Sequence, residues 1–132
     1  MAEIELTREV LDGLLDEARR ALPCEACGLL LGRGQGIDRI RPARNVHPVP
    51  QTHFEIDPQA LVDAHRAERE GGLRLIGYYH SHPRGAAEPS ATDRAQSSGD
   101  GRIWAIVGVD GVRFWRDDET GFVELSTRLV TR

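Results

Sequence analysis

The sequence GYYHSHPRGAAEPSATD, residues 77–93, is the stretch around which the rest of the chain is organised. It is preceded and opened by an apolar run, residues 73–79, that is typical of a buried strand. His80 and His82 follow this run two positions apart, so we expect both imidazoles on one face at the strand's end. The spacing therefore predicts two nitrogen ligands side by side.

The second half of the same stretch returns the chain to those histidines. Pro83 cannot continue a central strand, and residues 85–89 have the composition of a loop. Ser90 is a good N-cap for a helix over residues 91–98, whose first turn contains Asp93. Two histidines and one carboxylate in this order predict an open three-ligand zinc site, with the fourth position left to water.

Each of these features also has a purely structural interpretation. Ser90 and Asp93 match a capping box, which would serve only to satisfy free N–H groups at a helix start. A pair of histidines at a strand end can equally be held by hydrogen bonds alone. The order strand, proline-terminated loop and helix is nevertheless the order that a chelate requires, and it favours the metal site.

Two motif blocks, taken together, resemble a known family. HSHP at residues 80–83, followed by Ser90 and Asp93, is similar to the HxH(P)…S-x-x-D signature of the JAMM (MPN+) metalloproteases. In that family a glutamate near the N-terminus completes the site, in a context like P-x-E-x-C-G-x-L-x-G. This chain has PCEACGLLLG at residues 23–32, which places Glu25 at that position. The resemblance covers most of the chain, and no metal or catalytic position departs from it.

The resemblance implies a fold, a cofactor and a set of roles. It implies a cytidine deaminase-like α/β fold and one zinc ion held by His80, His82 and Asp93. Glu25 would take a proton from water and return it to the leaving amine, and Ser90 would donate to the oxyanion. The expected activity is that of a zinc metallopeptidase that hydrolyses a peptide or isopeptide bond.

The resemblance also implies a substrate class. The family commonly cleaves after the C-terminal Gly-Gly of ubiquitin or ubiquitin-like proteins, and small bacterial members resemble proteases that act on ubiquitin-like sulfur-carrier proteins, some of which release cysteine. This chain looks like those short members, because it has no insertion that would select a branched linkage. The expected partner is therefore a ubiquitin-like or sulfur-carrier protein; the sequence says nothing about oligomeric state.

Three other interpretations remain open at this stage. A zinc hydrolase of another substrate class, such as a phosphoesterase or a deaminase, would use the same metal, although the deaminase pattern adds a P-C-x-x-C that this chain lacks. A non-catalytic MPN-type scaffold is a binding module, whose members usually lose metal ligands. A closed structural zinc site would combine Cys24 and Cys27 with the two histidines of the motif and leave the glutamate and the aspartate without a role.

Length and composition set limits on the class of protein. A chain of 132 residues predicts one domain, residues 1–132, large enough to bury a core without disulfides. The net charge of -4 and the lack of any Lys/Arg block make nucleic acid a poor partner. No apolar run approaches the ~18 residues of a membrane helix, and the N-terminus does not resemble a signal peptide. We therefore expect a cytoplasmic protein that does not bind membranes.

The remaining cysteines and histidines have less specific contexts. Cys24 and Cys27 form a C-x-x-C, but a strand after them would send positions three apart to opposite faces, so we expect two ordinary thiols, one in the core. His47 and His53 lie in a proline-punctuated loop and are not expected to be ligands. His65 is expected to be a packed or surface residue of a helix.

The rest of the chain predicts a mixed sheet with helices packed on it, not a regular βαβ repeat. The order is β-α-β-β-α-β-α-β-β-β, with the first strand at a sheet edge and with Asp110-Gly111 as a hairpin turn. The expected strands are residues 3–6, 26–32, 37–43, 73–79, 102–109, 112–116 and 122–130; the expected helices lie between Thr7 and Pro23, between Asp57 and Gly71, and over 91–98.

Overall fold

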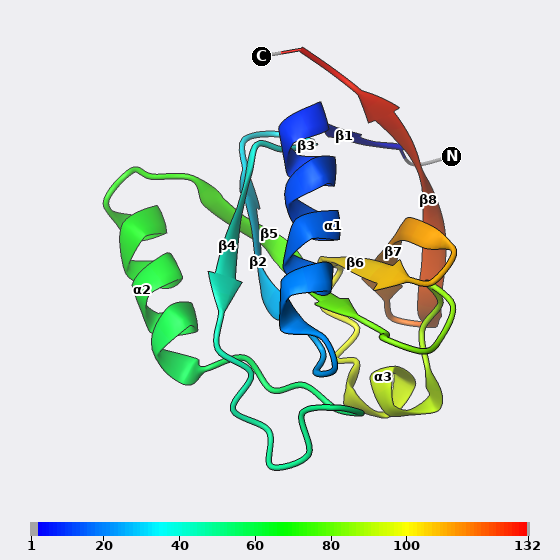
Figure 1. Cartoon of the computed structure of the whole chain (residues 1–132). Helices are drawn as coiled ribbons and strands as arrows, with labels where there is room; N and C mark the ends of the chain where they lie inside the picture. Colours follow the sequence, from blue (N-terminus) through cyan, green and yellow to red (C-terminus); the bar gives the residue numbers. More distant parts are fainter. Residues whose placement is uncertain (1–2, 132) are drawn as a thin grey trace.

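The computed structural model describes residues 3–131. In this part of the chain a mixed sheet of eight strands has three helices packed around it (Figure 1). The elements follow in the order β1 (Glu3–Leu6), α1 (Arg8–Ala21), β2 (Cys27–Gly32), β3 (Gly36–Ile37), β4 (Arg39–Ala43), α2 (Pro58–Arg69), β5 (Arg74–Ser81), α3 (Ala91–Gln96), β6 (Ile103–Gly108), β7 (Gly111–Asp118) and β8 (Gly121–Leu129). This confirms the predicted α/β class, a mixed sheet flanked by helices.

Strand β5 lies inside the sheet, whose strand order is β3-β1-β8-β7-β6-β5-β2-β4. It pairs antiparallel with β2 and parallel with β6. The predicted apolar run continues to Ser81, so the first histidine of the motif belongs to the strand itself and the second follows its last residue. The β2–β4 and β6–β7 hairpins also form as predicted.

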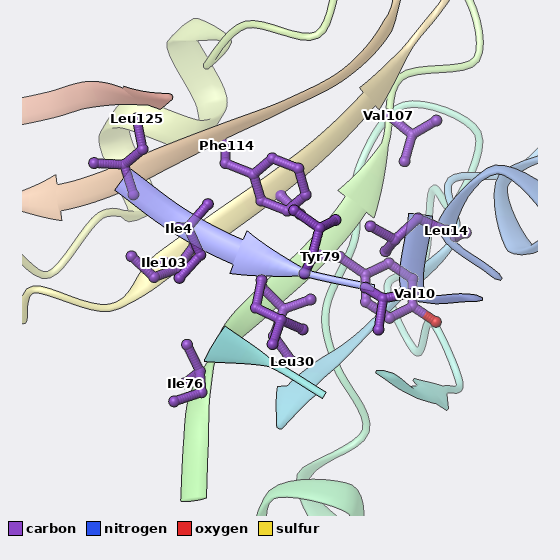
Figure 2. Packing of buried hydrophobic residues seen from close by; sticks show 14 residues of the cluster. Ile4, Val10, Leu14, Leu30, Ile76, Tyr79, Ile103, Val107, Phe114 and Leu125 are labelled. Carbon is purple, nitrogen blue, oxygen red and sulfur yellow. The ribbon is translucent and has the colours of Figure 1, made fainter. Parts of the chain in front are cut away.

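One face of the sheet is covered by helix α1, which begins at the predicted N-cap, where the Thr7 hydroxyl accepts a hydrogen bond from the Val10 amide. The buried residues between this helix and the sheet form one apolar cluster, in which Leu14, Leu30 and Tyr79 are almost completely buried (Figure 2). Burial of this apolar area is the main favourable term in folding.

The opposite face is covered by α2 and by loops, and its apolar contacts are divided into two smaller clusters. The first joins Leu29, Leu31, Ala64 and Leu75 beneath α2. The second joins Ala87, Trp104, Ile106 and Trp115, with Phe54 packed against it from the loop before α2. Within residues 3–131, no helix has the length and apolarity that crossing a membrane would take.

Three local predictions were wrong. Strand β1 is not at the sheet edge, because Gly36 and Ile37 pair with its outer side and Ile37 is completely buried there. The predicted strand over 37–43 is consequently split at Asp38, whose amide donates to Leu31. Helix α3 ends at Gln96 and not at 98, since Ser97 has an extended backbone (φ -66, ψ 142).

Candidate metal centre

Three side-chain atoms meet at the end of strand β5. The Nε2 atoms of His80 and His82 lie 3.1 Å apart, and each is 3.1 Å from Oδ2 of Asp93. His80 and Asp93 are buried, whereas His82 is partly exposed. The cluster therefore has one side open to solvent, as a site that admits a substrate requires.

Protons alone cannot satisfy this triangle. The Nδ1 atom of His82 lies 2.8 Å from the carbonyl oxygen of Ala86, which can only accept, so this nitrogen carries a proton. In a neutral ring Nε2 is then a bare lone pair that faces the lone pairs of Asp93. If both Nε2 atoms were protonated, each could donate to one oxygen of Asp93, but two N–H groups would then face each other across the 3.1 Å contact between the nitrogens. A single cation in contact with all three atoms satisfies every lone pair.

The electrostatic environment differs between the two imidazoles, and it keeps the Asp93 carboxylate ionised. Burial lowers the pKa of His80, although Asp93 opposes this effect. Burial also opposes protonation of His82, but its contacts with Asp93 and the Ala86 carbonyl raise its pKa overall. Burial disfavours the charged form of Asp93 as well, yet the two histidines hold the pKa of that carboxyl well below its usual range. The carboxylate stays charged in a buried position, where a cation is strongly favoured.

The start of helix α3 places Asp93 and resolves the conflict between capping and metal binding. The capping box is complete, because the Ser90 hydroxyl accepts from the Asp93 amide at 3.0 Å and the Ser90 amide donates to Oδ2 of Asp93 at 3.0 Å. The cap thus aims the carboxylate at the histidines. The Ser90 hydroxyl acts as an acceptor in this bond, so its own proton is still available to a substrate.

Strand register brings Glu25 to the same place. Cys27 of β2 lies opposite His80 of β5, so continuing the antiparallel register puts Glu25 opposite His82 on the same face. The pairing is extended by Ser81, whose amide donates to the Ala26 carbonyl and whose hydroxyl accepts from the Ala26 amide at 2.8 Å. Glu25 is only 7% exposed.

The acidity of Glu25 is changed by this position. Burial raises its pKa to about 7, with His82 opposing the shift and Asp93 adding to it. A carboxylate whose pKa lies near neutrality can both take up and release a proton. Glu25 faces a cleft with a volume of about 360 Å³. Ser90 and Asp93 also line this cleft, together with Phe54 and Arg84.

The structure separates these residues from the other candidates. Cys24 and Cys27 are free thiols outside the cluster, and burial raises the pKa of Cys27 to about 12. His47 stacks on His53 with ring centroids 4.6 Å apart, and His65 is exposed on α2. Among the residues that the structure describes, His80, His82 and Asp93 form the one group of three potential ligands.

Sequence reasoning missed several residues that hold the site in place. In the sequence motif, Ser81 is only the variable position between two histidines. In the structure its hydroxyl accepts a hydrogen bond from the Ala26 amide and so connects Ala26 to β5. Phe54 stacks on the His80 ring at 4.2 Å. The Asn45 side chain donates to the carbonyls of Glu25 and His53 and so joins the cleft wall to the glutamate. No local pattern marked them, because each acts on a residue distant in the sequence.

The fold and the site together define a class: a mixed-sheet α/β protein with an open His-His-Asp candidate metal site at a strand end and a glutamate beside it. The donor set fits zinc, whose tetrahedral bonds of 2.0–2.1 Å place ligand atoms about 3.3 Å apart. Comparison with known proteins agrees. Residues 7–118 match the family described as "Prokaryotic homologs of the JAB domain". The chain belongs to this family, which confirms the resemblance seen in the two motif blocks.

Individual relatives match most of the chain. A "Probable TtuB-protein conjugate cleaving protease" of Thermus thermophilus is 43% identical over 76% of this chain and 70% of its own length. A "Desampylase" of Haloferax volcanii is 34% identical over 95% of each protein. A solution structure from Desulfitobacterium hafniense superposes with a TM-score of 0.85 at 31% identity, covering 98% of this chain and 94% of that one.

Proposed function

We propose that this protein is a zinc-dependent metallopeptidase that hydrolyses a peptide or isopeptide bond after the C-terminal Gly-Gly of a ubiquitin-like, sulfur-carrier type of protein. The observation that carries the proposal is the triangle of 3.1 Å contacts between His80, His82 and Asp93, which two protons cannot satisfy. We also propose that one zinc ion binds there and that residues 1–132 act as one catalytic domain.

The chain's own residues have distinct roles in this proposal. Bound zinc would supply Lewis acidity, which polarises a carbonyl and lowers the pKa of water towards ~7. Glu25 accepts the proton of the attacking water and passes it to the leaving amine. Its buried position and its pKa of about 7 support both halves of this transfer. The Ser90 hydroxyl donates its free proton to the oxygen that becomes negative.

The proposed substrate rests on the relatives and on the shape of the cleft. The name of the Thermus relative specifies cleavage of a protein conjugate, and peptidase activity is likewise named for relatives from Mycobacterium, called "CysO-cysteine peptidase". The cleft runs between the segment 51–54 and the loop 82–85. A Gly-Gly end suits such a passage, because it has no side chains that would meet the walls.

The test uses a small ubiquitin-like carrier with a peptide extension after its Gly-Gly, and a second carrier joined by Gly-Gly to a lysine side chain of a peptide. The zinc-loaded protein is incubated with each, and the products are identified by intact mass. The chain contains no lysine, so every isopeptide-linked species belongs to the substrate. We expect cleavage directly after Gly-Gly with at least one of the two carriers.

Two variants make the assay decisive. Glu25→Gln keeps the shape of the side chain but cannot cycle a proton, so the rate should fall by about a hundredfold or more while zinc stays bound. Glu119→Gln makes the same charge change in an exposed turn and should behave like the parent. Failure to cleave either carrier, combined with release of amino acids from unrelated short peptides, would contradict the carrier substrate.

A further inference from the structure

One peptide group near the metal centre has both of its polar atoms bound by side chains. The carbonyl of Ala86 accepts the Nδ1 proton of His82 at 2.8 Å. The amide of the same peptide unit, N–H of Ala87, donates to Oδ1 of Asp110 at 2.9 Å. Asp110, one peptide plane and His82 therefore form a continuous chain of hydrogen bonds that ends at the candidate metal.

The neighbouring structure fixes this peptide in place. Ala87 is completely buried, and its own carbonyl accepts a hydrogen bond from Nε1 of Trp115 at 3.1 Å. Gly108 lies directly against the peptide: a Cβ built there would clash with the Ala87 nitrogen and would be 2.8 Å from Oδ1 of Asp110. The β6–β7 hairpin thus holds the Ala86–Ala87 peptide through Asp110 and the next peptide through Trp115, and Gly108 leaves room for them.

The turn at Asp110 does not explain where its carboxylate goes. In the sequence, Asp110-Gly111 predicts a hairpin turn; in the structure Gly108 pairs with Gly111 around the loop residues Val109 and Asp110, and Gly111 has a positive φ of 119. Aspartate is favoured in turns mainly because its side chain bonds to backbone close by in the sequence. Here Oδ1 instead bonds to an amide 23 residues away. The turn and the contact with Ala87 are therefore separate features.

We propose that Asp110 is a positioning residue that acts on His82 through the Ala86–Ala87 peptide and strengthens metal binding; this inference rests on the metal role proposed above. An amide N–H that donates to a carboxylate polarises its own carbonyl, since hydrogen bonds in a chain reinforce one another. A more negative Ala86 carbonyl holds the Nδ1 proton of His82 more firmly. This contact fixes the tautomer and makes Nε2 a better ligand, as a direct carboxylate partner does in other metal sites.

The experiment measures zinc affinity by competition with a chromogenic chelator. Asp110→Asn keeps a neutral oxygen of the same shape as an acceptor, whereas Asp110→Ala removes the acceptor altogether. Groups that hydrogen-bond to a metal-ligating side chain typically contribute about 10–100-fold to metal affinity. Both variants should therefore weaken zinc binding by about tenfold or more. Asp100→Asn is the matched control, because Asp100 is, like Asp110, an exposed residue whose carboxylate accepts from a backbone amide, here that of Arg102. It should leave the affinity within about twofold, since in the described part of the chain the Arg102 amide has no hydrogen-bonded connection to a metal ligand.

The outcomes separate this inference from the proposed function. If Asp110→Asn binds zinc like the parent while Asp110→Ala alone weakens it, the carboxylate only holds the loop, and the inference is overturned. If the parent itself binds no zinc, both the metal centre and the inference fail. Melting temperatures of the metal-free proteins provide the fold control: we expect Asp110→Asn to match the parent, so that its loss of affinity belongs to the site.

Discussion

Tyr79 and His80 are neighbours on strand β5 and both are almost completely buried, yet they face different environments. Tyr79 lies in the hydrophobic cluster beneath α1, which joins fourteen buried residues (Figure 2). His80 lies on the opposite face in contact with the rings of Phe54 and Trp104, and its Nε2 atom lies 3.1 Å from Oδ2 of Asp93. The α1 face is built for stability, and the opposite face divides its core so that polar groups can gather at one end.

The largest effect is expected on the α1 face. Leu14→Ala removes a side chain with no exposed area and should lower the free energy of unfolding by about 2–5 kcal/mol in urea titrations. The amount of zinc bound per folded molecule should not change, because none of the candidate site residues belongs to the cluster that contains Leu14. Val62→Ala on α2, 48% exposed in the parent, is the control and should stay within about 0.5 kcal/mol.

A parallel loss of zinc affinity in folded Leu14→Ala protein would contradict the separation of roles between the two faces. It would mean that the two faces are coupled through β5 and that stability and metal binding cannot be assigned to separate layers.

Ser90 should give the next largest effect, this time on the site face. Its hydroxyl accepts from the Asp93 amide and keeps a proton for the substrate, so Ser90→Ala removes two functions. Turnover should fall by about 10²–10³ from the lost oxyanion donor, and stability by about 1 kcal/mol from the lost cap. Steady-state kinetics at low temperature and a melting curve separate the two losses. Near-normal turnover at low temperature would show that Ser90 is only a cap.

Ser81 should show a smaller and mixed effect, because it supports the site from within the strand. Ser81→Ala leaves the Ala26 amide without its side-chain partner, at a cost of about 1–3 kcal/mol in unfolding experiments. Turnover should fall with little change in KM, because Glu25 loses its fixed position. Ser98→Ala, an exposed serine near the end of α3, is the control. A variant with full turnover would show that the main-chain pairing alone positions Glu25.

Local patterns in the sequence were sufficient for most elements and for the grouping of His80, His82 and Asp93. His80, His82 and Asp93 follow one another within fourteen residues, and the strand, the loop and the helix between them have strong local signals. The capping box could be recognised as well, although the sequence did not show that capping aims the Asp93 carboxylate at the histidines. These predictions succeeded because each depends on residues close together in the chain.

What could not be predicted depends on the register between distant strands. The position of Glu25 beside His82 follows from the pairing of Cys27 with His80, which no composition rule supplies, and it entered the sequence analysis only through family resemblance. Strand β3 is two residues long, too short for a periodic signal, so β1 was wrongly placed at an edge. The contact from Asp110 to Ala87 spans two loops and has no local signal.

Whether the motif histidines and Asp93 hold the metal is tested by measuring the zinc content of the protein after purification in the presence of zinc and removal of weakly bound ion. Element analysis compares the parent, His82→Ala, and the double variant Cys24→Ser/Cys27→Ser. We expect about one zinc per chain in the parent and in the double cysteine variant, and almost none in His82→Ala. A site with three protein ligands loses most of its zinc affinity when one of these ligands is removed. Zinc lost from the cysteine variant but retained by His82→Ala would contradict the account, because the metal would then belong to a cysteine site.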